Sequence, residues 1–135
     1  MKTGIQNIVL PTLFEKAASI FDAKTKTGWV CVECMSRGLY YQKYYCLVDG
    51  KCQSINDKPS FIETWTQDNN LIIQTKWYEN DLVHRIGGPA NLIYNFSFDR
   101  LYSFYSLHDI SYTMEAYWDH PLLLEHKLNK ILTEL

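Results

Sequence analysis

The sequence has no long hydrophobic run and no excess of charge of either sign. Its 135 residues include 13 Lys and Arg against 15 Asp and Glu, which gives a formal net charge of −2. Without a basic face to neutralise several phosphates, nucleic acid is not an expected partner. The apolar runs are too short to cross a bilayer, and no small-residue cleavage site follows the first apolar stretch. We therefore expect an intracellular protein with no membrane partner.

The sequence motifs that usually mark catalysis are also missing. There is no glycine-rich phosphate loop, no nucleophile elbow and no pair of carboxylates that a local pattern places on one face. His108 lies beside Asp109 in a predicted turn, and His120 and His126 are six positions apart, which is not the spacing of helical metal ligands. We expect no cofactor and no enzymatic activity.

The four cysteines are the only candidates for a metal site, and their spacing is unfavourable. Four thiolates can hold a structural zinc, with roughly two to four residues between paired ligands. Here five residues separate Cys46 from Cys52, and on a strand Cys31 and Cys34 would point to opposite faces. We predict reduced, buried thiols and no metal. Cys46 and Cys52 could approach each other across the Asp49-Gly50 turn and oxidise adventitiously.

Aromatic side chains are abundant, with ten Tyr, six Phe and four Trp. Such residues suit half-buried pleated surfaces, so a β-rich core accounts for most of the excess. A tyrosine-lined contact face is the alternative, because Tyr and Trp are also enriched at interfaces.

The pattern along the chain predicts a single α+β domain. Pro11 and an apolar repeat that ends at Phe21 indicate a helix in the N-terminal segment (1–27). Residues 28–118 read as an antiparallel β-meander of hairpins, because turn signals such as Asp49-Gly50 separate short strand-like runs. Asp119 and Pro121 open a C-terminal helix (119–135). The remaining predicted turns are Asp68-Asn69-Asn70, Asn80-Asp81 and Phe98-Asp99-Arg100.

The C-terminal helix carries more leucine than one narrow stripe needs. We expect its stripe to bury itself against a sheet face or a sheet edge. Leucines left over would form an exposed patch, and such patches mark interfaces. We therefore predict a homodimer through this helix or through a sheet edge. The stripe consists of Leu124, Leu128, Ile131, Leu132 and Leu135.

The most specific motif lies in Lys76–Tyr94, KWYENDLVHRIGGPANLIY. It resembles the W-Y-x-N-G-x-x-H-R-x-x-G-P-A hairpin repeat, similar in style to MORN repeats, of proteins from large DNA viruses, phages and some bacteria. The tight-turn glycine of that pattern is Asp81 here. The matching residues are Trp77, Tyr78, Asn80, His84, Arg85, Gly88, Pro89 and Ala90.

Two weaker copies of this unit can be aligned with it. CLVDGKCQSINDKPSFI places Asp49-Gly50 against Asn80-Asp81, and Pro59 against Pro89 if one residue is inserted. FYSLHDISYTMEAYW would be a decayed third copy. The alignment predicts a sheet of three hairpin units.

The resemblance implies an architecture and structural roles for the motif residues. His84 and Arg85 would tie loop carbonyls or a carboxylate such as Glu79, and Gly88 would adopt a left-handed conformation. It further implies a non-enzymatic viral or phage protein that binds or scaffolds an unidentified protein partner in the host cytoplasm or nucleus, or in the virion. The alternative is a small enzyme, or a nucleotide-binding inhibitor of a host defence pathway, with a pocket near His84 and Arg85.

Overall fold

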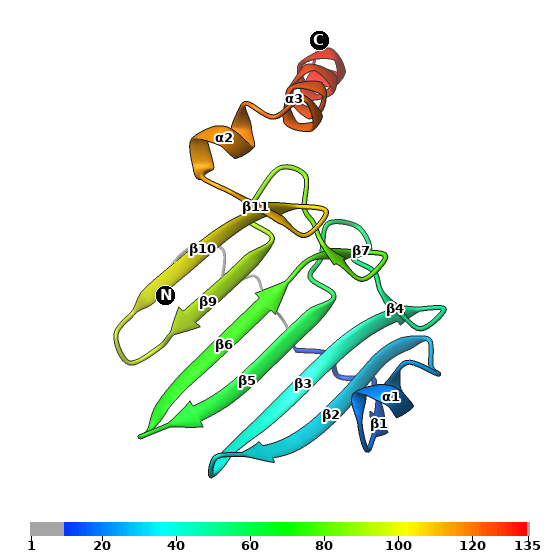
Figure 1. The fold of residues 1–135 in the computed structure, drawn as a ribbon, viewed down its shortest axis with the longest axis vertical. Coiled ribbons are helices and arrows are strands. Elements are labelled where there is room, and N and C mark those ends of the chain that lie inside the picture. The colour runs from blue at the N-terminus through cyan, green and yellow to red at the C-terminus, as the bar shows by residue number, and fades with distance from the viewer. Residues whose placement is uncertain (1–9, 135) are drawn as a thin grey trace.

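The computed structural model describes residues 10–134, which form one large sheet with helices at its two ends (Figure 1). Within that range, nine strands share the sheet in the order β1-β2-β3-β5-β6-β9-β10-β11, with β4 beside β3. Only the β1–β2 pair is parallel. β7 and β8 form a separate two-stranded ladder. The predicted α+β class and meander-like order are thus confirmed.

The elements have the following bounds. The strands are β1 (Glu15–Ala17), β2 (Gly28–Ser36), β3 (Leu39–Val48), β4 (Lys51–Cys52), β5 (Phe61–Gln67), β6 (Asn70–Lys76), β7 (Tyr78–Glu79), β8 (Leu82–Val83), β9 (Asn91–Asn95), β10 (Arg100–Leu107) and β11 (Ile110–Tyr112). The helices are α1 (Ile20–Ala23), α2 (Met114–Trp118) and α3 (Pro121–Glu134).

Tight turns with two left-handed residues close the hairpins. Asp49-Gly50 has φ of 51° and 79°, Asn80-Asp81 has 49° and 68°, and His108-Asp109 has 47° and 69°. Positive φ at both central residues matches the twist of the flanking strands. Asp, Asn and His tolerate this region better than other residues with side chains. Asp81 therefore keeps the turn that the resembled motif builds with glycine.

Consecutive hairpins are hydrogen-bonded to one another through two of these turns. The backbone N–H of Asp81 donates to the carbonyl of Cys52 (3.0 Å), and the Asp81 carboxylate accepts from the N–H of Cys52 (2.6 Å). Asp109 makes the same two contacts with Val83, at 2.8 and 2.6 Å. The Asn80-Asp81 and His108-Asp109 turns thus each clamp the return strand of the preceding hairpin, so the clamp occurs twice along the stack.

Other backbone bonds recur at the aligned positions. Cys46 N–H donates to Ser60 (2.8 Å), and Trp77 N–H donates to Ala90 (2.9 Å). Cys46 also accepts from the N–H of Gln53 (3.2 Å), as Trp77 accepts from that of His84 (3.0 Å). The aligned residues of the first two hairpins therefore occupy equivalent places in the fold.

Apolar side chains bury themselves in three separate clusters. The first lies under α1 and contains Val30, Leu47 and Cys52. The second, on the other face of the sheet, centres on Tyr44, whose ring meets the edge of Phe14 at 5.4 Å. The third joins α2 and α3 to the third hairpin through Leu107, Tyr117 and Leu123. Each fully buried large apolar side chain contributes about 1.5–3 kcal/mol, so the clusters hold both ends of the sheet.

The predicted N-terminal helix is wrong except for one short piece. Helix α1 has four residues, and the side chain of its N-cap Ser19 accepts from the N–H of Asp22 (3.3 Å). Glu15–Ala17 instead pair with Val30–Val32 along the outer edge of β2. Ladder bonds to an otherwise open edge outweigh the small differences in helix propensity. The rest of the predicted segment (1–27) includes residues 1–9, outside the described range.

The C-terminal helix is confirmed, but its predicted burial is not. The meander ends at Tyr112 instead of residue 118, since Thr113 caps α2 with a bond to the N–H of Ala116 (3.2 Å). Helix α3 then projects beyond the sheet (Figure 1). Its Leu123 is buried, while the apolar stripe stays 52–58% exposed. At about 100° per residue, the stripe residues lie about 80° to 180° around the helix from Leu123, and every described residue of α3 after Leu123 is exposed, so anchoring Leu123 does not bury the stripe. Leu135 lies outside the described residues.

We predict that Gly50→Ala destabilises the protein much more than Gly38→Ala. Both glycines have positive φ, which costs a side-chain-bearing residue about 1–2 kcal/mol. A Cβ at Gly50 would also lie 2.4 Å from the Lys24 carbonyl oxygen, whereas Gly38 has open space. Overpacking of this kind adds about 1–3 kcal/mol. Urea denaturation of the two variants measures the difference, and equal losses would contradict this packing of α1 on the first turn.

Candidate functional site

The hairpin motif lines a shallow, open hollow of about 330 Å³ between the first two hairpins and α3. The loop after β4, the β7–β8 hairpin and the motif residues all contribute to its wall. Its lining residues are Gln53, Ser54, Asp57, Trp77, Tyr78, Glu79, His84, Arg85, Ile86 and His126. This is the place that the sequence suggested for a pocket.

The Arg85 side chain is fully engaged within the protein. Its guanidinium lies 4.0 Å from the centre of the Trp77 ring. Two of its nitrogens donate to the two carboxylate oxygens of Asp57 (3.0 and 3.1 Å), and a third donates to the Pro89 carbonyl (3.1 Å). Stacking together with a bidentate carboxylate makes this a structural clamp between hairpins. No local pattern predicts Asp57 as the partner, because it lies 28 positions away from Arg85.

The glycine loop depends on Tyr117, which the sequence did not single out. The buried Tyr117 hydroxyl accepts from the N–H groups of Gly87 (3.0 Å) and Gly88 (3.1 Å). The left-handed residue is Gly87, with φ of 95°, so the conformation predicted for Gly88 was assigned to the wrong glycine. Gly88 is constrained in another way: a Cβ there would lie 3.0 Å from the Arg85 guanidinium, which would have to shift by a few tenths of an ångström.

His84 connects the second hairpin to the third. It is 7% exposed, and its ring stacks on His108 with centroids 4.0 Å apart. Its Nδ1 accepts from the backbone N–H of His108 (3.0 Å), and its Nε2 lies 3.3 Å from Glu79. Gln53 has the equivalent role one hairpin earlier, because its Oε1 accepts from the N–H of Asn80 (2.9 Å). An accepting Nδ1 means that the proton of neutral His84 is on Nε2.

Glu79, His84 and His108 bring three potential metal ligands within 4.8 Å of one another. Two features argue against a metal there. The imidazole rings are nearly parallel, at 15°, so their in-plane lone pairs do not converge on one ion. Ligation through Nε2 would also require a proton on the Nδ1 of His84, which accepts a backbone bond instead. The cluster fits a structural role, with the Glu79 carboxylate 3.3 Å from Nε2 of His84 and 3.5 Å from Nε2 of His108.

The environment of His84 favours its neutral form. Burial lowers the pKa of His84, and neighbouring His108 lowers it further, while Glu79 opposes the shift. Protonation would place a hydrogen on Nδ1, facing the N–H of His108. The hydrogen bond from the backbone N–H of His108 to His84, one of the contacts between the second and third hairpins, therefore requires neutral His84.

The cysteines are dispersed over the fold. Cys31 and Cys52 are buried in different clusters, while Cys34 and Cys46 are half-exposed, so the prediction of burial holds for two of the four. Cys52 pairs with Leu47 across the hairpin. Side chains alternate along a strand, so Cys46 points to the other face, and the predicted approach of Cys46 and Cys52 is wrong. Burial raises the pKa of Cys52 to about 12, which makes its thiol unreactive at neutral pH.

Comparison of the chain with models of protein families, with curated proteins and with solved structures finds no match. The likeness of Trp77–Ala90 to viral hairpin repeats therefore remains a prediction. In residues 10–134, no helix is long and apolar enough to cross a membrane.

We predict that the free energy of unfolding falls as the pH drops below about 6.5, the usual pKa of histidine. With its pKa lowered in the fold, His84 binds a proton more readily in the unfolded chain, so acid favours unfolding. His84→Gln keeps an acceptor, as Gln53 does naturally, and removes the titration. Denaturation at about pH 7.5 and pH 5.5 should show a smaller loss for the variant than for wild type. Equal losses would show that His84 does not control this contact.

Proposed function

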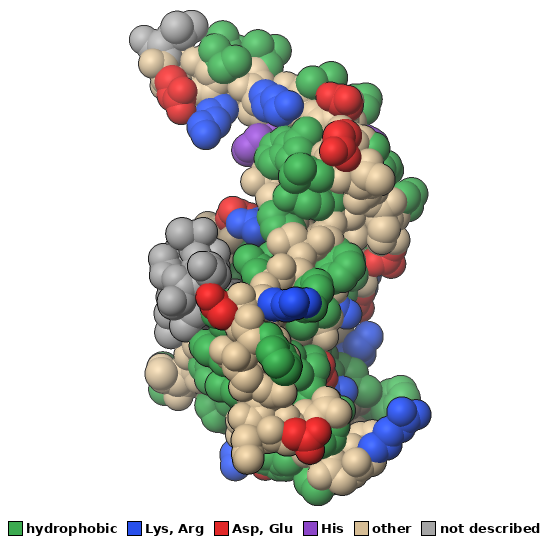
Figure 2. Space-filling view, turned by 90° about the vertical axis from the view of Figure 1, so that its left-hand side faces the viewer, with side chains coloured by type: hydrophobic (Ala, Val, Ile, Leu, Met, Phe, Trp, Pro, Cys, Tyr) green, Lys and Arg blue, Asp and Glu red, His purple; other side chains and the backbone are tan. Residues whose placement is uncertain are grey.

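We propose that this chain is a non-enzymatic protein-binding module whose contact surface is the apolar stripe of α3, namely Leu124, Leu128, Ile131 and Leu132. The observation that carries the proposal is the exposure of these four large apolar side chains on a helix projecting from the body. Figure 2 shows hydrophobic side chains gathered on that projecting part. Contiguous exposed apolar surface of this kind marks interaction sites.

The stripe suits a helical partner. Leu124, Leu128 and Ile131 follow spacings of four and three, the pattern that packs one helix against another. The flanking charges on α3, Glu125, Lys127, Lys130 and Glu134, cancel one another. The partner segment we propose is therefore an amphipathic helix selected mainly by its apolar face. A helix of 14 residues is marginal without packing, so binding would also stabilise α3.

The geometry of the hollow argues against catalysis there. The Arg85 guanidinium is already paired with Asp57, and His84 is held by His108 and Glu79. General acid–base chemistry needs a group that is free to exchange protons with a substrate. These residues instead support the stack of hairpins that presents α2 and α3.

The resemblance to viral and phage hairpin repeats suggests where such a module would act. On that basis we propose a role inside an infected cell, in the cytoplasm or nucleus, or in the virion.

The hollow near His84 and Arg85 supports a second candidate, a small-molecule site. Its volume of about 330 Å³ is sufficient for a small ligand. A nucleotide bound there would have to displace Asp57 from Arg85. Thermal unfolding with added nucleotides tests this candidate, because tight binding to the folded state raises the melting temperature.

A photo-crosslinking residue at Leu128 should capture a discrete partner in the cell that naturally makes this protein. The same residue at Lys130 is the matched control, since that position is exposed on the opposite side of α3. Mass spectrometry of the adducts identifies the partner and the segment bound. We expect adducts on an amphipathic helix from Leu128 and none from Lys130.

Equal adducts from both positions, or none from either, would contradict a binding role for the stripe. Adducts with a second copy of the chain, together with a dimer mass in light scattering, would make the predicted homodimer the partner.

A further inference from the structure

In each of the first two hairpins, five residues of the first strand pair with the next strand of the sheet, which follows the hairpin. Tyr41–Tyr45 of β3 pair with β5, and Ile72–Lys76 of β6 pair with β9. The two segments are equivalent in the alignment, 31 positions apart (41 to 72). The same five places in the third hairpin, 28 positions further on (72 to 100), are Arg100–Phe104 of β10.

The third edge has no such partner among residues 10–134. Arg100–Phe104 pair with β9 on their inner side. On the outer side β11 covers only Tyr105–Leu107, much as β4 covers only the end of β3. The first two hairpins continue through a loop into the next strand, but the third leaves this path at Thr113, the N-cap of α2. Within the described part of the chain, the sheet therefore ends with an open edge.

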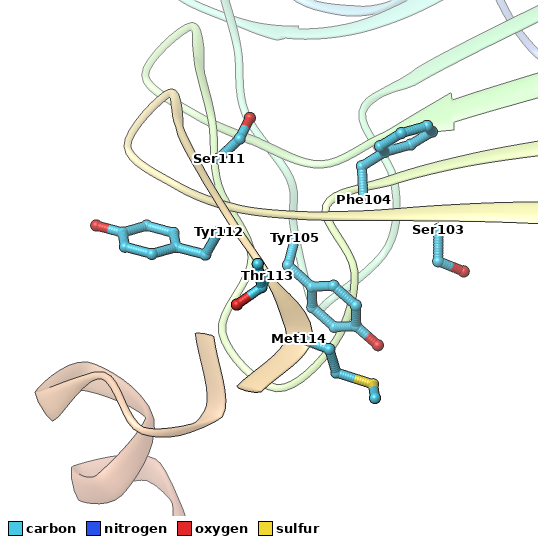
Figure 3. Close-up of a pocket in the computed structure, with 7 residues that line it drawn as sticks. All are labelled: Ser103, Phe104, Tyr105, Ser111, Tyr112, Thr113 and Met114. Carbon is cyan, nitrogen blue, oxygen red and sulfur yellow. The ribbon is translucent and has the colours of Figure 1, made fainter. Parts of the chain in front are cut away.

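A hollow of about 460 Å³ adjoins this edge. It is lined by residues on both sides of the β10–β11 turn, and Figure 3 shows Ser103, Tyr105 and Met114 pointing to one side of the ribbon and Phe104 to the other. In the earlier hairpins, the residues equivalent to Tyr105 are Cys46 and Trp77. Their backbone N–H groups donate to the carbonyls of Ser60 and Ala90, respectively. Both of these small residues are 0% exposed. The hollow thus lies where a next small residue would dock.

We propose that the outer edge of β10, with this hollow, is a binding site for an extended segment of another protein, which adds as an antiparallel strand. Strand addition satisfies the open backbone groups of an edge while side-chain pockets give selectivity. This surface is separate from the stripe of α3, so the proposal does not depend on that helix.

The chain itself indicates the chemistry of the segment. Ser60 and Ala90 are each followed two residues later by a buried aliphatic side chain, Ile62 or Leu92. The segment that binds therefore has a small residue, then any residue, then Ile or Leu, and it binds in an extended conformation. The opposite edge of the sheet is less available, because β1 covers Val30–Val32 of β2.

A synthetic peptide with the sequence of Gly88–Asn95, GPANLIYN, carries this pattern and can be labelled for fluorescence anisotropy. Backbone N–H groups point alternately to the two sides of a strand. Ser103 is equivalent to Tyr44 and Thr75, which pair with the next strand, so the N–H of Ser103 points to the outer edge. Ser103→Pro removes the outward N–H and leaves the pairing with β9, while Ser103→Ala keeps the N–H. We expect saturable binding to wild type and Ser103→Ala, and binding at least about ten-fold weaker to Ser103→Pro.

Circular dichroism verifies that both variants are folded, and a peptide with Leu92→Asp is the ligand control. No binding to folded wild type, or equal binding to Ser103→Ala and Ser103→Pro, would overturn the proposal. A wild-type dimer that does not bind the peptide, and that dissociates when Ser103→Pro is introduced, would also overturn the proposal, because a second copy of the chain would then occupy the edge. Peptide binding that is unchanged by Leu128→Glu in α3 would show that this site is independent of the proposed contact surface on α3.

Discussion

The contact on which this fold depends is the clamp between one tight turn and the return strand of the preceding hairpin. Asp81 is hydrogen-bonded to both the N–H and the carbonyl of Cys52, and Asp109 is hydrogen-bonded to the same two groups of Val83. A left-handed Asp costs about 1–2 kcal/mol relative to glycine, whereas a hydrogen bond to a charged carboxylate contributes about 1.5–3 kcal/mol. Aspartate at these positions is therefore favourable on balance. The clamp fixes the spacing of hairpins, and so brings Arg85 to Asp57 and His84 to His108.

The sequence predicted the parts of the fold that depend on local chemistry. Asp49-Gly50, Asn80-Asp81 and His108-Asp109 form turns because few other residues accept positive φ. The repeated spacing also located the equivalent strands. Arg37-Gly38 closes the β2–β3 hairpin in the same left-handed way, yet it was not singled out, because Arg is not a typical turn residue.

What the sequence could not predict depends on distant partners. The apolar spacing before Phe21 suits a helix, but the open edge of β2 draws Glu15–Ala17 into a strand. The leucines of α3 were expected to face the sheet, but α3 is anchored near its start, where Leu123 packs with Tyr117 and Leu107, and the rest of the helix projects beyond the sheet. Within the candidate site, Asp57 and Tyr117 were missed since each meets its partner across roughly thirty positions.

Amide hydrogen exchange in Asp81→Gly tests the clamp most directly. Glycine relieves the left-handed strain and restores the residue of the resembled motif, but it removes the carboxylate that holds the N–H of Cys52. We expect faster exchange at Cys52, unchanged exchange at Val83, which Asp109 holds, and a net loss of about 1 kcal/mol in the free energy of unfolding. Unchanged exchange at Cys52 together with a more stable protein would contradict a stabilising clamp.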